Sequence, residues 1–200
     1  MKSQNRFCFC SRRNKIQHTT DDFLSHEEQL NFNLFDHNIQ RLQVKGDGNC
    51  LFYALAQGLI HEMKNDPYNF AIQLQTFGLS LNLTLYDFAN RLRKICVEQW
   101  TINEKYYSQF VDTQRISFLK EVKNFSKSGV SNTILGDIVP LTISNIFTIK
   151  IIIFTSLYNL SRINIQPEYE DKSLLLPQKT IYLAYNQYGI GHYDAAYPRT

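Results

Sequence analysis

The chain has 200 residues and a mass of 23.5 kDa, the size of one large domain. Apolar residues make up 44% of it and charged residues 20%, so it can build a sizeable core and is not globally disordered. The balance of 21 basic against 18 acidic residues is too even to indicate nucleic-acid binding, and four cysteines are too few for a disulfide-stapled scaffold.

The first 38 residues are polar and weakly periodic, so we expect an N-terminal extension over residues 1–38. Thr20 or Asp21 is suited to cap a short helix inside it. The start of the chain lacks the about 7–15 consecutive apolar residues of a signal peptide, and no run reaches the roughly 20 residues of a membrane helix. We therefore expect a cytoplasmic protein with free thiols and no membrane contact, acting in a host cytosol if its source is a pathogen or symbiont.

From residue 39 the pattern becomes regular. Residues 40–44 alternate polar and apolar side chains, which predicts a short edge strand. A turn-rich run, 45–50, then leads into an apolar segment, 51–59, that predicts a buried helix with Cys50 at its start.

The middle of the chain is predicted to be helical. Three- and four-residue spacing of apolar side chains indicates helices over 69–77, 85–100, 114–125 and 138–147. In the second of these, the spacing leaves Arg91, Arg93 and Lys94 on the outer face.

The end of the chain turns to strands. Residues 148–155, 180–185 and 192–197 are rich in β-branched and aromatic side chains, and the last two should pair around a turn. The segment 157–179 reads as irregular. Residues 39–200 are thus expected to form one α/β or α+β layered domain, with a small central β-sheet flanked by helices.

Cys50 is the first candidate for chemistry. A cysteine becomes a nucleophile when its thiolate is stabilised, and the free N–H groups and dipole of a helix N-terminus do this. Gly48 and Asn49 precede it in a turn whose amides are able to converge on one point, as an oxyanion hole requires. A small buried cysteine that merely opens a helix is the alternative.

His192 is the natural partner for such a nucleophile. It stands two residues before Asp194, and in an extended segment those two positions share one face. Asp194 is then able to hold the imidazole in the useful tautomer. A nucleophile, a base and an orienting acid together make the pattern of an activated cysteine, although a histidine in a surface turn is the alternative.

Three blocks of the sequence carry a family resemblance. Residues 47–56, DGNCLFYALA, closely resemble the catalytic motif of the ovarian tumour (OTU) family of cysteine proteases, which are mostly deubiquitinases. Residues 181–185 with 191–194 resemble the catalytic-histidine block of that family, and 135–154 resemble the segment ahead of its central strand. The blocks occur in the family's order and cover roughly residues 40–200.

The resemblance implies a papain-like fold and a mechanism. Cys50 would attack the carbonyl of ubiquitin's C-terminal glycine, and His192 would move the proton between thiol and departing amine. Amides around Gly48 and Asn49 would hold the oxyanion, Asp194 would orient the histidine, and Asp47 would shape the loop. No cofactor and no metal is implied. The expected partner is ubiquitin or polyubiquitin, with no nucleic acid and no membrane.

Some features leave other readings open. Tyr53 stands where the family commonly has arginine, and the middle block lacks a tryptophan and paired glycines. The alternatives are a catalytically weak OTU-fold module that binds ubiquitin, or a protease acting on another ubiquitin-like modifier. A redox protein is disfavoured because no Cys-x-x-Cys pair is present. Cys8 and Cys10 with His18 make half a zinc site without a second pair to complete it.

Overall fold

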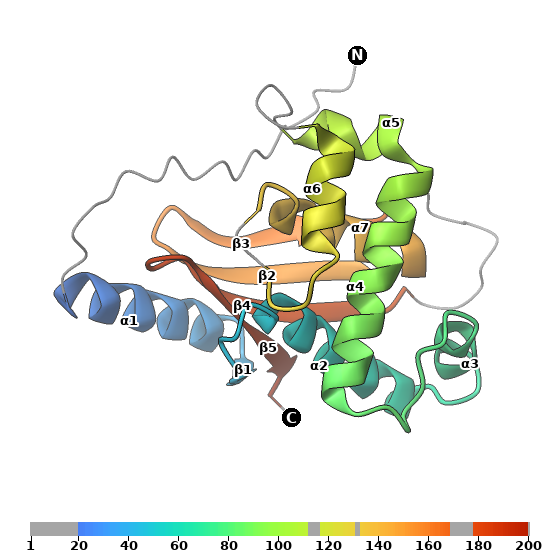
Figure 1. Cartoon of the computed structure of the whole chain (residues 1–200). Coiled ribbons are helices and arrows are strands. Elements are labelled where there is room, and N and C mark those ends of the chain that lie inside the picture. The colour runs from blue at the N-terminus through green and yellow to red at the C-terminus, as the bar shows by residue number, and fades with distance from the viewer. Residues whose placement is uncertain (1–19, 112–116, 131–132, 169–177, 200) are drawn as a thin grey trace, which may run out of the picture.

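A five-stranded mixed β-sheet forms the centre of the protein (Figure 1). The computed structural model describes residues 20–111, 117–130, 133–168 and 178–199. The strands are β1 (Ile39–Leu42), β2 (Lys150–Leu157), β3 (Leu160–Ile165), β4 (Thr180–Asn186) and β5 (His192–Pro198). They lie in the order β1-β5-β4-β2-β3, with β2 and β4 parallel and the other neighbours antiparallel.

Helices cover both faces of this sheet. They are α1 (Thr20–Asp36), α2 (Cys50–Asn65), α3 (Phe70–Gln75), α4 (Leu85–Ile102), α5 (Glu104–Tyr107), α6 (Phe118–Phe125) and α7 (Val139–Phe147), with short 3₁₀ turns at Ser108–Phe110 and Gly136–Ile138. The expected layered α+β domain with a small central sheet is confirmed. Among the described residues, no helix is both long and apolar enough to span a membrane.

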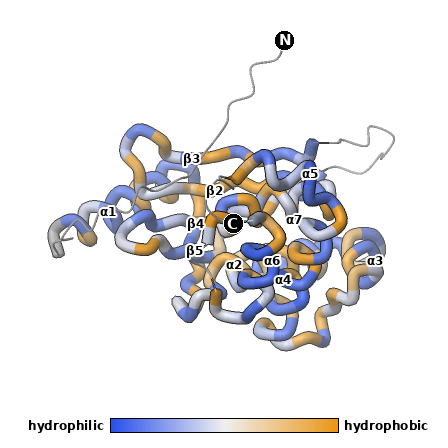
Figure 2. The backbone as a smooth tube through the Cα atoms, turned by 45° about the horizontal axis from the view of Figure 1, so that its top comes forward, coloured by the Kyte–Doolittle hydropathy of each residue, from blue (hydrophilic) through white to orange (hydrophobic). Residues whose placement is uncertain are grey.

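The alternation of side chains along β2 explains why both faces are covered. Ile151 and Ile153 point to one face and join the main core, which α2, α4, α6 and α7 complete. Ile152 and Phe154 belong to the other face, where α1 packs. Because both faces of β2 are apolar, the strand reads as a nearly continuous hydrophobic run, as Figure 2 shows.

Helix α1 is packed against the sheet. Its Leu30 and Leu34 are buried together with Phe154, Ala184 and Ala196 of three strands. The boundary expected at residue 39 stays a prediction, but residues 20–36 pack on the same sheet as the strands that follow.

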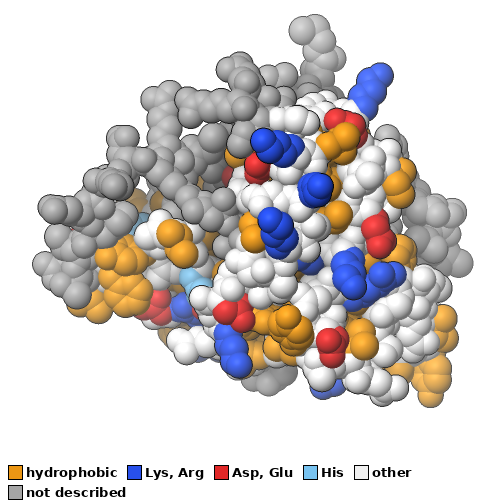
Figure 3. Space-filling model, viewed as in Figure 1, with side chains coloured by type: hydrophobic (Ala, Val, Ile, Leu, Met, Phe, Trp, Pro, Cys, Tyr) orange, Lys and Arg blue, Asp and Glu red, His pale blue; other side chains and the backbone are white. Residues whose placement is uncertain are grey.

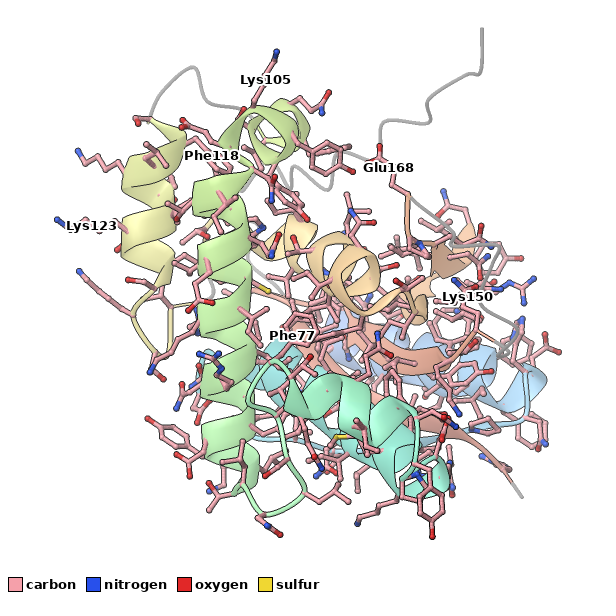
Figure 4. All side chains as sticks on the ribbon, turned by 90° about the vertical axis from the view of Figure 1, so that its right-hand side faces the viewer. Phe77, Lys105, Phe118, Lys123, Lys150 and Glu168 are labelled. Carbon is pink, nitrogen blue, oxygen red and sulfur yellow. The ribbon has the colours of Figure 1, made fainter. Side chains whose placement is uncertain are left out.

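Helices α4 and α6 are amphipathic, with their basic side chains turned outward. Figure 3 shows Lys and Arg side chains gathered over these two helices. In Figure 4, Lys123 points away from α6, whereas Phe118 of the same helix is buried in the core. One part of the outward prediction is wrong: Arg93 of α4 is buried, with 2% of its surface exposed.

Two other local predictions differ from the structure. The segment 157–179, read as irregular, contains β3, which pairs with β2 as an edge strand. In β1 the alternation is reversed, because Leu42 is exposed and Arg41 faces the interior beneath α1. The start of the helix predicted from residue 114 lies outside the described residues, and the described part begins at Phe118.

The packing of α1 predicts a contrast between two positions of one helix. Leu30→Ala should lower the free energy of unfolding by about 2–5 kcal/mol, because Leu30 is fully buried against the sheet. Phe32→Ala should change it by less than about 0.5 kcal/mol, since Phe32 is 63% exposed. Urea unfolding measures both, and equal losses would show that α1 is not docked in solution.

Candidate active site

Cys50 is the first residue of α2, at the junction that the sequence predicts. The residue is 8% exposed and carries a free thiol. The backbone amide of Tyr53 donates to the carbonyl of Asn49 at 2.9 Å, and this hydrogen bond forms the first turn of the helix, which contains Cys50. The unpaired N–H groups of a helix start favour negative charge, which suits a thiolate at this position.

The Asp47 carboxylate shapes the loop before Cys50. Its Oδ1 accepts the backbone N–H of Asn49 at 3.1 Å, and its Oδ2 accepts the hydroxyl of Tyr53 at 3.1 Å. The pKa of Tyr53 is raised, first by burial and then by the hydrogen bond to Asp47. Tyr53, which departs from the family's common arginine, therefore still contacts the loop acid.

Gly48 allows this loop to approach a second one. Its φ is +83°, and a Cβ added there would lie 2.0 Å from the carbonyl oxygen of Gly129. Only glycine fits both the backbone angle and the contact. The predicted turn residue is thus required for packing against residues 128–130, a role that sequence pattern alone does not reveal.

Arg93 joins the same two loops from inside the protein. Its guanidinium donates to the carbonyl of Gly48 at 3.3 Å and to Oδ1 of Asn49 at 2.9 Å. It also donates to the carbonyls of Phe125 and Val130, and it lies over the neighbouring rings of Phe52 and Phe125.

Burial lowers the pKa of Arg93 to about 10, so it remains cationic at neutral pH. Oδ1 of Asn49 also accepts the amide of Gly129 at 3.0 Å. The side chain of Asn49 therefore fixes the loop and does not cap α2. The spacing of Arg93 from Ala89 and Cys96, four and three residues, is the sequence signal that its position lies on the buried face.

His192 lies at the start of β5 and connects Cys50 with Asp194. Its Nε2 is 3.1 Å from Oδ1 of Asp194, as the two-residue spacing predicts. The hydrogen bond to Asp194, and then that to Cys50, raise the pKa of His192 to about 10. Because Nε2 faces the carboxylate, Nδ1 is the nitrogen left for the thiol.

Asp194 is almost completely buried and nevertheless ionised. Burial alone would raise its pKa, but hydrogen bonds from His192, from the amide of Val44 and from Arg41 outweigh this and lower it. The amide of Val44 lies 2.7 Å from Oδ1, and Nε of Arg41 lies 2.7 Å from Oδ2. No sequence signal points to Arg41, since strand alternation does not indicate that a charged side chain is largely shielded from solvent.

The four residues suggested as catalytic thus fall into two groups. Cys50, His192 and Asp194 form one connected line, whereas Asp47 sits beside it and contacts Asn49 and Tyr53. Within the described ranges, no group of three His, Cys, Asp or Glu side chains could hold a metal ion. Cys8, Cys10 and His18 lie outside those ranges, and Cys96 is buried in the core.

Comparison with known proteins identifies the fold. The OTU domain of OTUD1 superimposes with a TM-score of 0.57 at 16% identity, covering 88% of this chain and 96% of that one. An OTUB1 chain from a complex with ubiquitin aldehyde and UBC13~Ub gives a TM-score of 0.60 at 16% identity, over 92% of this chain and 85% of its own. No protein-family model and no curated protein matches the sequence. The chain therefore has the OTU fold.

The loop contact at Gly48 predicts a specific loss. Gly48→Ala should destabilise the protein by more than the about 1–2 kcal/mol of left-handed strain, because the new methyl group would collide with Gly129. Gly189→Ala is the matched control, with φ +65° and no atom within 4 Å of its added Cβ. Urea unfolding compares the two variants, and equal losses would contradict the close loop contact.

The raised pKa of His192 predicts how stability depends on pH. The folded protein keeps a proton that the unfolded chain releases near the ordinary value of 6.5. The stabilisation is complete below that pH and is lost as pH rises through about 10. Unfolding free energies measured across this range should fall less steeply in His192→Gln than in the wild type. The control is His61→Gln, which removes a ring that packs on Tyr197 and should keep the wild-type slope. An unchanged slope in His192→Gln would contradict the raised pKa of His192.

Proposed function

We propose that this protein is a thiol-dependent deubiquitinase, which cleaves bonds after the C-terminal glycine of ubiquitin. The observation that carries the proposal is the arrangement of three groups: His192 is hydrogen-bonded to Asp194, and its pKa is raised further by the Cys50 thiol, which lies at the N-terminus of a helix. The OTU fold supports the same conclusion, because three of the similar structures are OTUB1 in complexes with ubiquitin aldehyde.

The chemistry begins with the proton of Cys50. With its raised pKa, His192 holds a proton at neutral pH, and an imidazolium beside the sulfur favours the thiolate. The Sγ electron pair attacks the carbonyl carbon of the terminal glycine, and the carbonyl π electrons move onto oxygen. Because the amide N–H of Asn49 is already bonded to Asp47, we assign the oxyanion to the N–H groups of Gly48 and Cys50.

Two proton transfers by His192 complete the cycle. The tetrahedral intermediate collapses, the bond to the lysine nitrogen breaks, and the leaving amine takes the proton from Nδ1. A thioester between ubiquitin and Cys50 remains. Neutral His192 then accepts one proton from the attacking water, a second collapse breaks the C–S bond and releases the thiolate, and the new carboxyl group of ubiquitin gives its remaining proton to solvent. Asp194 keeps the ring oriented through both steps.

A ubiquitin that carries a C-terminal propargylamide tests this assignment. The wild type should form a covalent adduct, and Cys50→Ala and His192→Ala should form none within the same time. The double variant Cys8→Ser/Cys10→Ser should react like the wild type. Electrophoresis and mass spectrometry of the modified peptide measure the outcome.

The same probe separates the alternative functions. A chain that binds ubiquitin by calorimetry without forming an adduct would be a binding module, and the proposal would fail. Adducts only with probes built on other ubiquitin-like modifiers would overturn the choice of substrate. An undiminished adduct in Cys50→Ala would overturn the nucleophile.

A further inference from the structure

The buried carboxylate of Asp194 needs hydrogen-bond donors that its own strand does not fully supply. Its side chain is 1% exposed, and it lies on the face of β5 that also carries Ala196, under helix α1. A carboxylate removed from water must be matched by donors on both oxygens. His192 and the amide of Val44 serve Oδ1, which leaves Oδ2 for another group.

Arg41 of β1 supplies that group. It is paired with Ala196 in the β1–β5 register, so Asp194 is its diagonal neighbour on the same face. Its Nε and Nη2 both lie 2.7 Å from Oδ2 of Asp194. The side chain is 14% exposed, so this ion pair is largely shielded from solvent.

Helix α1 in turn holds Arg41. The remaining arm, Nη1, donates to Oε1 of Glu27 in that helix. The second carboxylate oxygen of Glu27 accepts a hydrogen bond from Nδ2 of Asn186 at 2.8 Å. Asn186 is the last residue of β4, where the turn to His192 begins. Glu27 is therefore fixed from both sides.

The charges alternate along this line. Glu27 of α1, Arg41 of β1, Asp194 and His192 of β5, and Cys50 of α2 follow one another, each in contact with the next. Loss of the Glu27 or Arg41 contact therefore changes the electrostatic environment of His192 through Asp194. Tyr193 of β5 is also electrostatically coupled to this group, because burial and then the charges of Tyr185, Asp137 and Cys50 raise its pKa.

We propose that Arg41 and Glu27 are positioning residues of the candidate active site. Arg41 fixes the orientation and the ionised state of Asp194, and Glu27 fixes Arg41. Helix α1 is thereby part of the catalytic unit and not an accessory extension. The inference deepens the proposed deubiquitinase function, but it concerns the reactivity of Cys50 and is testable without ubiquitin.

The first test follows the alkylation of Cys50 by iodoacetamide against pH, read by mass spectrometry of the peptide that contains it. In Arg41→Gln the cation that pairs with Asp194 is lost, so an uncompensated negative charge remains in the line and proton release from Cys50 becomes harder. The acid limb of the profile should move up by about half to one pH unit. With a fluorogenic ubiquitin substrate, kcat should fall about tenfold while KM stays unchanged. Arg41→Lys should restore part of both.

A double-mutant cycle then asks whether Arg41 acts through Asp194. Arg41→Gln should lower the alkylation rate of the wild type several-fold, but it should add less than about twofold in the Asp194→Asn background. Equal effects in both backgrounds would overturn the proposal, because Arg41 would then act independently. Far-UV circular dichroism and thermal melting check that each variant folds. If Arg41→Gln does not fold, the double-mutant cycle is measured with Arg41→Lys in its place.

The link to α1 has its own control on the same helix. Glu27→Ala releases Arg41 and should move the acid limb to higher pH, by less than Arg41→Gln does. If Glu27 acted only through its negative charge and did not anchor Arg41, its loss would move the acid limb to lower pH. That result, or no movement, would overturn the role of Glu27. Glu28→Ala, at the exposed neighbouring position, should leave the profile unchanged.

These readouts separate the two proposals. If the ubiquitin probe forms no adduct but the alkylation profile shifts as expected, the substrate is wrong and the positioning line stands. If the probe reacts and Arg41→Gln leaves alkylation and kcat unchanged, the function stands and the positioning line fails.

Discussion

The buried carboxylate of Asp194 is the constraint around which the site is organised. An ionised group under a helix and a sheet is stable only if every lone pair is matched. Asp194 meets this condition with three donor groups: the imidazole of His192 in its own strand, and the amide of Val44 and the guanidinium of Arg41 from β1 and the residues just after it. The need to satisfy one anion therefore determines how β1, β5 and α1 meet.

A second buried charge does the same for the other half of the site. Arg93 lies over the neighbouring rings of Phe52 and Phe125, and its Nη1 and Nη2 donate to the loop before Cys50 and to the carbonyls of Phe125 and Val130. No carboxylate accepts from it in the described structure; carbonyl and amide oxygens do. The loop before Cys50 is thus held by a cation on the α2 side of the sheet, and His192 by an anion on the α1 side. The two meet only where His192 contacts Cys50.

The local sequence predicts much of this protein, because the signals involved are short-range. The turn before Cys50, the helix after it and the shared face of His192 and Asp194 all follow from spacing within a few residues. The apolar periodicity predicts the helices other than the short α5 and the strands other than β3. The sequence does not predict β3 because its burial is uneven and leaves no regular alternation. The segment is a strand only through its pairing with β2.

What the sequence by itself determined is most of the elements, the place of Cys50 at a helix start and the place of His192 beside Asp194, since each depends on neighbouring residues. Only the tertiary structure decided which charged side chains are buried. Arg41 and Arg93 look like surface residues in their own elements, and Glu27 lies in a segment expected to be an extension. The physical reason is that burying a charge is favourable only when partners far along the chain match it, and those partners are brought together by the fold.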